Sequence, residues 1–146
     1  MVTKASVRLD MLLVEDDEVD VMNVRRAFKR KQISTPLLVA RNGLDALKML
    51  RTKDDKAPQE TSRPKMVLLD LNMPRMNGLE FLKELRSDPD LQRTPVVVLT
   101  TSDDDRDRER AYSYNVAGYF LKTAAFDQFA DAMETMSNYW SLCEMP

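Results

Sequence analysis

Short apolar runs that end in a polar side chain constrain the fold of this chain more than any other feature. The runs occupy 9–14, 66–69, 95–99 and 118–121, and the polar residues that follow them are Glu15, Asp70, Thr100 and Lys122. Runs of this length are typical of buried strands, and parallel strands place their carboxyl ends at one edge of a sheet. The pattern predicts that acids, a hydroxyl and an ammonium share that edge, which is where α/β proteins bind ligands.

Segments with apolar residues at helical spacing separate these runs. A further strand is predicted at 35–39, and helices are predicted at 18–31, 44–50, 78–87, 103–117 and 126–143. The polar stretch 52–65 has no apolar period and contains Pro58 and Pro64, so we expect a loop there. Strand and helix alternate along the whole chain. This order predicts an α/β fold with a five-stranded parallel, doubly wound sheet and helices on both faces.

Composition narrows the functional classes. The 146 residues predict one domain over 1–146, and 22 basic against 24 acidic residues do not favour a nucleic-acid partner. Apolar stretches of only about five residues exclude a membrane span. The single cysteine and an N-terminus without a signal-peptide pattern favour the cytoplasm. Because the sequence contains no histidine, the chain cannot be a phosphohistidine donor or hold a histidine-ligated zinc ion.

The residue types at the predicted sheet edge suit phosphoryl transfer to a carboxylate. Glu15, Asp16 and Asp70 would repel one another unless a cation lies between them, and oxygen ligands of this kind favour Mg²⁺. Lys122 could pair with Asp70 and then with a phosphoryl oxygen. The Thr100 hydroxyl could bond to that oxygen and move the loop after its strand.

Each residue also has a simpler interpretation. Acids after a strand commonly cap the next helix, a lone threonine is usually turn structure, and a lone lysine is usually solvated. It is their coincidence at successive strand ends that favours a functional site. If Thr100 moves inward, Tyr119 on the neighbouring strand is the aromatic residue placed to fill the vacated space.

These motifs resemble the receiver domain of two-component response regulators over nearly the whole chain. The matching segments are Val14-Glu15-Asp16-Asp17, Leu69-Asp70-Leu71-Asn72-Met73-Pro74 with Gly78, the strand before Thr100, and Tyr119 to Lys122. The resemblance implies a flavodoxin-like (βα)5 receiver fold and a phosphoprotein with magnesium at its site. It assigns Asp70 as phosphoacceptor, Thr100 and Lys122 as its partners, Thr100 and Tyr119 as the switch, and Glu15, Asp16, Asp70 and the Asn72 carbonyl as metal ligands.

Two positions depart from the usual receiver pattern. Most receivers follow the lysine with a proline in a cis peptide bond, whereas Thr123 follows Lys122 here. A cis bond before a residue other than proline costs about 2.5–4 kcal/mol, so the state of the Lys122–Thr123 bond stays open. Glu15 replaces the commoner aspartate, which lengthens one ligand arm and keeps its charge.

A narrower resemblance concerns the stand-alone regulators associated with bacterial phytochrome histidine kinases. It is carried by the polar loop before Arg63-Pro64, by residues 87–102 and by the tail 139–146. It implies a light-sensing histidine kinase as partner, although a kinase with another sensor fits the same residues. The resemblance implies a signal-transduction protein that accepts a phosphoryl group and is not an enzyme, apart from promoting its own phosphorylation and dephosphorylation.

The end of the chain predicts how such a protein would act. We expect no DNA-binding or enzymatic module after the last helix, so the output would be an interaction surface. The apolar extension 137–146 carries more apolar residues than one helix face can bury. We expect Tyr139, Trp140, Leu142 and Met145 to form an interface, most simply that of a symmetric homodimer.

Two other functions stay open from the sequence. One is a phosphohydrolase with an aspartyl-phosphate intermediate, although such enzymes usually carry a second carboxylate two residues after the nucleophile, where this chain has Asn72. The other is a receiver-like module that binds or dimerises without phosphorylation. The intact set of acids, hydroxyl and lysine argues against that module, whereas Thr123 is consistent with it.

Overall fold

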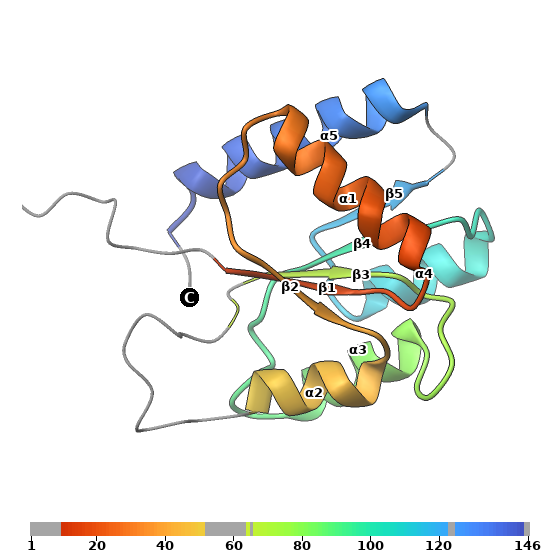
Figure 1. The fold of residues 1–146 in the computed structure, drawn as a ribbon. Coiled ribbons are helices and arrows are strands. Elements are labelled where there is room, and N and C mark those ends of the chain that lie inside the picture. The colour runs from red at the N-terminus through yellow and green to blue at the C-terminus, as the bar shows by residue number, and fades with distance from the viewer. Residues whose placement is uncertain (1–9, 52–63, 65, 123–124, 145–146) are drawn as a thin grey trace, which may run out of the picture.

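A central sheet with helices on both of its faces forms the body of the molecule (Figure 1). The computed structural model describes residues 10–51, 64, 66–122 and 125–144. The strands are β1 (Met11–Val14), β2 (Leu37–Ala40), β3 (Met66–Leu69), β4 (Val96–Thr100) and β5 (Gly118–Leu121). The helices are α1 (Glu18–Arg30), α2 (Gly43–Arg51), α3 (Gly78–Ser87), α4 (Asp105–Ser113) and α5 (Phe126–Leu142). The predicted alternation of strand and helix is confirmed.

The five strands are parallel and lie in the order β2-β1-β3-β4-β5. This order confirms the predicted doubly wound, flavodoxin-like sheet. The chain moves outward from β1 to β2 and then crosses to β3 on the other side, so the strand order reverses between β1 and β3. Ligands bind at such a reversal, beyond the carboxyl ends of the strands. Val14 and Leu69 pair across β1 and β3, so the residues that follow them emerge side by side.

The three inner strands are buried and apolar because helices cover both faces of the sheet. Helices α1 and α5 pack on one face, and α2, α3 and α4 pack on the other (Figure 1). Side chains alternate between the two cores, so that Leu13 faces α1 and α5 while Leu12 faces the other layer. The edge strands β2 and β5 are only partly buried.

Polar side chains fix where the helices that flank the candidate site begin. Asp17 caps α1 by accepting hydrogen bonds from the backbone amides of Val19 and Asp20 at 2.8 and 3.4 Å. Asn77 caps α3 in a reciprocal capping box with Glu80. The alternative sequence interpretation, that acids after β1 cap a helix, is therefore correct for Asp17. It does not account for Glu15, which is buried.

Helix α3 begins against the backbone of the loop that follows β3. A Cβ atom at Gly78 would lie 2.5 Å from the carbonyl oxygen of Asp70 and 2.6 Å from the Cα atom of Leu71. Only glycine permits this approach, because neither backbone atom can move away as a flexible side chain could. The sequence thus places α3 directly on the segment that carries Asp70.

Helix α5 presents two kinds of surface. Ala130, Met133 and Met136 are buried against the sheet, whereas Tyr139 and Leu142 are 61% and 86% exposed. The split agrees with the expectation that one helix face cannot bury all of these side chains. Met145 lies outside the described residues, as does nearly all of the predicted loop 52–65. Among the helices of the described part, none is long and apolar enough to cross a membrane.

Several element bounds differ from the sequence prediction by one or two residues, and those of α4 differ by more. The predicted helix 103–117 is shorter, because Asp104 caps α4 and the helix ends at Ser113. The predicted strand 35–39 begins two residues later and ends one residue later, at Leu37–Ala40. Both segments lie at the edge of the fold, where burial constrains the sequence least.

Candidate functional site

The carboxyl edge of the sheet carries the polar side chains that the sequence placed there. Glu15 directly follows β1, Asp70 follows β3, Thr100 is the last residue of β4, and Lys122 follows β5. Backbone hydrogen bonds hold these positions together: the amide of Asp70 donates to the carbonyl of Val14 at 3.0 Å, and that of Lys122 donates to the carbonyl of Thr100 at 2.8 Å. The regular parallel register therefore sets the spacing of the site.

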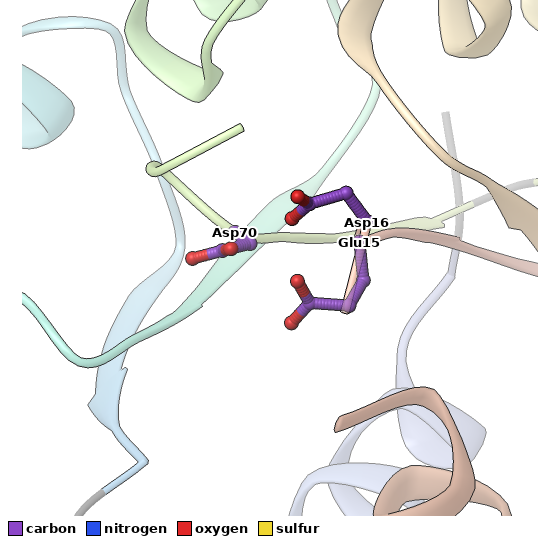
Figure 2. A group of neighbouring side chains, drawn as sticks. All are labelled: Glu15, Asp16 and Asp70. Carbon is purple, nitrogen blue, oxygen red and sulfur yellow. The ribbon is translucent and has the colours of Figure 1, made fainter. Parts of the chain in front are cut away.

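Three carboxylates converge at the end of β1 and β3. Carboxylate oxygens of Glu15, Asp16 and Asp70 all lie within 4.8 Å of one another. Figure 2 shows the Glu15 and Asp16 side chains leaving the end of β1 on the side of Asp70. Glu15 and Asp70 are buried, and Asp16 is exposed. Hard oxygen ligands with one open, solvated side fit Mg²⁺, which keeps several waters and uses few carboxylates.

Lys122 supplies a positive charge at this cluster. Its ammonium is hydrogen-bonded to Glu15, lies 3.0 Å from an oxygen of Asp20 and lies 3.8 Å from Oδ1 of Asp70. The sequence predicted pairing with Asp70, whereas in the structure Glu15 and Asp20 are the nearer partners. Asp20 was missed because it lies inside a helix, away from the strand end that carried the prediction. An acid in the first turn of the helix after the acidic loop was the available signal.

Burial and charge act in opposite directions on the two central groups. Burial raises the pKa of the Glu15 carboxyl well above its usual value, the hydrogen bond from Lys122 lowers it, and Asp70 raises it further. Burial alone would lower the pKa of the Lys122 ammonium, but its hydrogen bonds to Glu15 and Asp20 and the charges of Asp70 and Glu15 outweigh that effect and raise it. The raised pKa of Lys122 reflects the negative charge that these acids place at this edge of the sheet.

The Asp70 side chain sits in a turn that follows β3. Its Oδ1 accepts a hydrogen bond of 3.4 Å from the backbone amide of Asn72. Asn72 is exposed, and its predicted role as a carbonyl ligand stays a prediction. Asp70 is only 6% exposed, so little of its carboxylate contacts solvent. A group that reacts with it must enter from the open side of the carboxylate cluster.

Thr100 and Tyr119, the predicted switch residues, both contact Ser102 in the loop after β4. The Thr100 hydroxyl oxygen accepts from the amide of Ser102 at 3.2 Å, and the Tyr119 hydroxyl donates to the carbonyl of Ser102 at 2.9 Å. Thr100 is fully buried and Tyr119 is partly buried. The Ser102 hydroxyl donates to Asp107 of α4 at 2.7 Å, which connects this loop to the helix. The Lys122–Thr123 bond lies outside the described residues.

Comparison with protein families gives one match over most of the chain. The family described as "Response regulator receiver domain" matches residues 11–134. The match ends within α5, which continues to Leu142. The probable methanogenesis regulatory protein FilR2 of Methanothrix harundinacea is 38% identical over 130 residues, covering 89% of this chain and 82% of that protein.

Two further relatives are response regulators whose structures have been solved. Response regulator Rcp1 of Synechocystis is 35% identical over 130 residues, covering 89% of this chain and 87% of Rcp1. Its Mn²⁺-bound crystal structure superposes with a TM-score of 0.79 over 93% of this chain and 97% of the other, at 34% identity. The crystal structure of the phosphorylated cyanobacterial phytochrome response regulator RcpA superposes with a TM-score of 0.83. The superposition covers 96% of this chain and 99% of RcpA, at 33% sequence identity. The predicted resemblance to regulators associated with phytochromes is confirmed.

Proposed function

This chain belongs to the response regulator receiver domain family of two-component signalling, and we propose that its Asp70 accepts a phosphoryl group from a sensor histidine kinase. In that step an Asp70 oxygen forms a bond to phosphorus while the bond from phosphorus to the histidine nitrogen breaks. The electron pair stays on that nitrogen, which takes up a proton. The partner supplies the histidine, since this sequence has none. The observation that carries the proposal is the juxtaposition of Asp70 with two acids and the Lys122 ammonium.

Glu15, Asp16 and Asp70 are the residues that would hold Mg²⁺, with the Asn72 carbonyl as a further ligand. Bound Mg²⁺ neutralises charge on phosphoryl oxygens, which is most of what a protein contributes to a loose, in-line transfer. Three carboxylate ligands in the described site support this assignment, and the relative Rcp1 has been crystallised with Mn²⁺. Lys122 supplies a second positive charge, which compensates the acids when the phosphoryl group is absent.

The signal would leave the site through the loop that follows β4. A phosphoryl oxygen on Asp70 offers the Thr100 hydroxyl a hydrogen-bond acceptor, and a shift of Thr100 would move Ser102, to which its oxygen is bonded. Tyr119 holds the same residue by its hydroxyl. Movement of this loop would therefore change the position of Tyr119 and of α4, which Ser102 reaches through Asp107.

The output surface is proposed to be a homodimer interface on β5 and α5. Phe120, Tyr139 and Leu142 are exposed, and Tyr139 packs edge-to-face on Trp140 with ring centroids 5.3 Å apart. Phe120, Tyr139 and Trp140 line a mostly apolar groove between the edge strand and the helix. In a symmetric dimer this patch would pack against the same patch of a second copy, and the exposed apolar area of both copies would be buried.

Phosphorylation by a small donor tests the acceptor. The protein is incubated with acetyl phosphate with and without Mg²⁺, and its intact mass is measured beside Asp70→Asn. The matched control is Asp131→Asn, which removes an acid from α5 that pairs with Lys31. We expect one added phosphoryl mass in wild type and control, only with Mg²⁺, and none in Asp70→Asn. If no protein gains mass at any Mg²⁺ concentration, the acceptor role is wrong and a phosphorylation-independent binding module explains the chain better.

Light scattering after size exclusion tests the dimer on the same samples. We expect Leu142→Ser to weaken the dimer, because it removes a side chain that is 86% exposed on the proposed interface. Met22→Ser is the matched control, since Met22 is 56% exposed on α1 and does not line the groove. A monomeric wild type, both before and after phosphorylation, would contradict the dimer without affecting the acceptor role.

Phosphotransfer tests the class of kinase. Rcp1 and RcpA support a phytochrome-class partner, because RcpA is a phytochrome response regulator and both are similar to this chain. We expect faster transfer from phytochrome histidine kinases than from kinases with other sensor domains, measured as initial rates at equal kinase concentration. Faster transfer from a kinase with another sensor would contradict this assignment and leave the acceptor role unchanged.

A further inference from the structure

The Lys122 ammonium is shared among three carboxylates that come from three different elements. Glu15 follows β1, Asp70 follows β3, and Asp20 lies in the first turn of α1. The ammonium is hydrogen-bonded to Glu15 and lies 3.0 Å from Oδ2 of Asp20, but it lies 3.8 Å from Oδ1 of Asp70. A separation of 3.8 Å is too long for a hydrogen bond. Lys122 is thus hydrogen-bonded to Glu15 and to Asp20 of α1, and it makes no hydrogen bond to Asp70.

The position of Asp20 is set by the way α1 begins. The carboxylate of Asp17 caps the helix and accepts from the backbone amide of Asp20. Val21 and Val24, which follow Asp20 on α1, are buried against the sheet, so the helix cannot rotate freely. The Asp20 side chain is 30% exposed and that of Lys122 is 12% exposed. Their contact is therefore partly shielded from water, which makes it stronger than a fully exposed ion pair.

We propose that Asp20 is a positioning residue that holds the Lys122 ammonium on the α1 side of the site, away from Asp70. This inference rests on the proposed function of Asp70 as acceptor. It adds that Asp20 controls how close the Lys122 ammonium lies to the Asp70 carboxylate. Without Asp20 the ammonium keeps its bond to Glu15 and moves toward Asp70. The Asp70 carboxylate would then be occupied by an ammonium that a metal ion or an incoming phosphoryl group must displace.

Crystal structures of the metal-free protein test the position of the ammonium directly. In Asp20→Asn we expect the separation of Lys122 Nζ and Asp70 Oδ1 to shorten from 3.8 Å to a hydrogen-bond distance. The control is Glu18→Gln, which removes the same charge from the same helical turn without touching Lys122, because Glu18 pairs with Arg41. An ammonium that stays where it is in Asp20→Asn overturns the proposal.

Mg²⁺ titration calorimetry provides the second measurement. Both variants lower the affinity through lost negative charge, but Asp20→Asn also lets Lys122 compete for Asp70. We expect its affinity to fall at least about threefold below that of Glu18→Gln, the scale of one partly shielded ion pair. In a Lys122→Met background the two substitutions should have equal effects, as a double-mutant cycle requires for an effect that passes through Lys122.

The outcomes separate this inference from the function on which it rests. Equal affinities for Asp20→Asn and Glu18→Gln, or an excess loss that persists in the Lys122→Met background, would overturn the role of Asp20. Neither measurement involves phosphorylation. If instead the wild type takes up no phosphoryl group while the ammonium moves as expected, the acceptor role fails and the positioning role of Asp20 stands.

Discussion

Arg86 connects separate segments of the backbone, and its substitution gives a sharp test of what stabilises the side of the fold next to α4. The residue lies in the last turn of α3. Its guanidinium donates to the carbonyls of Tyr114 at 2.7 Å, Gln92 and Thr94 at 2.8 Å, and Asn115 at 3.2 Å. These acceptors lie in the loop before β4 and in the turn before β5. One side chain therefore fixes the segments that lead into two neighbouring strands.

The expected loss follows from which of these carbonyls water can reach. The bonds to Gln92 and Asn115 are exposed, so their carbonyls can be hydrated once Arg86 is gone. The bonds to Tyr114 and Thr94 are partly buried. A buried acceptor left without a partner costs about 1–3 kcal/mol. Two fully buried carbonyls would cost about 2–6 kcal/mol. These two are only partly buried, and the burial that lowers the pKa of the guanidinium also disfavours its charge, so we expect Arg86→Met to lose about 2–4 kcal/mol.

Urea unfolding followed by circular dichroism and by Trp140 fluorescence measures this loss. Arg86→Lys keeps the charge but loses the planar fork, so it should fall between wild type and Arg86→Met. Arg93→Met is the control, because Arg93 is an exposed arginine in the loop before β4, between the acceptors Gln92 and Thr94. A loss below about 1 kcal/mol in Arg86→Met, with an unchanged m-value, would refute the reasoning, since it would mean that water replaces all of the bonds.

Three further substitutions have defined outcomes. Gly78→Ala places a Cβ atom 2.5 Å from the Asp70 carbonyl oxygen, so we expect a loss of about 1–3 kcal/mol in urea unfolding together with weaker Mg²⁺ binding by calorimetry. Asn77→Ala removes the capping box with Glu80 and should cost about 1 kcal/mol with unchanged Mg²⁺ affinity. Thr100→Val removes the buried hydroxyl at nearly the same volume, so we expect the variant still to gain one phosphoryl mass. If light scattering shows that phosphorylation changes the oligomeric state of the wild type, we expect no such change in Thr100→Val, and a change equal to that of the wild type would contradict the switch role.

The sequence was sufficient for the fold because its strongest signals are those that burial controls. The strands β1, β3 and β4 are covered on both faces, so each is a continuous apolar run. Residues that end these runs must lie at the edge of the sheet, which is why Glu15, Asp70 and Thr100 could be placed. The start of the edge strand β2 was predicted two residues too early because its side chains are only partly buried.

The partners of individual side chains could not be predicted in the same way. The nearest partners of Lys122 depend on how α1 is rotated about its axis, which packing of Val21 and Val24 decides and residue spacing does not. Asp20 therefore appeared only in the structure. Arg86 could not be found at all, because its acceptors are backbone carbonyls, which every residue type provides. Sequence patterns therefore predict where in the fold a site lies, whereas the hydrogen-bond partners within the site depend on how the elements pack.

The three carboxylates that could hold a cation repel one another when no cation is bound, so they should lower the free energy of unfolding of the metal-free protein. The substitution Asp70→Asn tests this loss of stability. Two unit charges 4.8 Å apart repel by about 3 kcal/mol at an effective dielectric constant of roughly 20, and Asp70 faces both Glu15 and Asp16 within that distance. Attraction to Lys122 at 3.8 Å cancels much of this repulsion.

We therefore expect Asp70→Asn to be about 1 kcal/mol more stable than wild type in urea with a chelator, as neutral substitutions at active sites often are. With saturating Mg²⁺ the order should reverse, because binding to the folded state stabilises the protein that retains all three carboxylates. Lower stability of Asp70→Asn in the chelator would show that Lys122 more than balances the acids. The site would then be preorganised for its ammonium instead of for a metal ion.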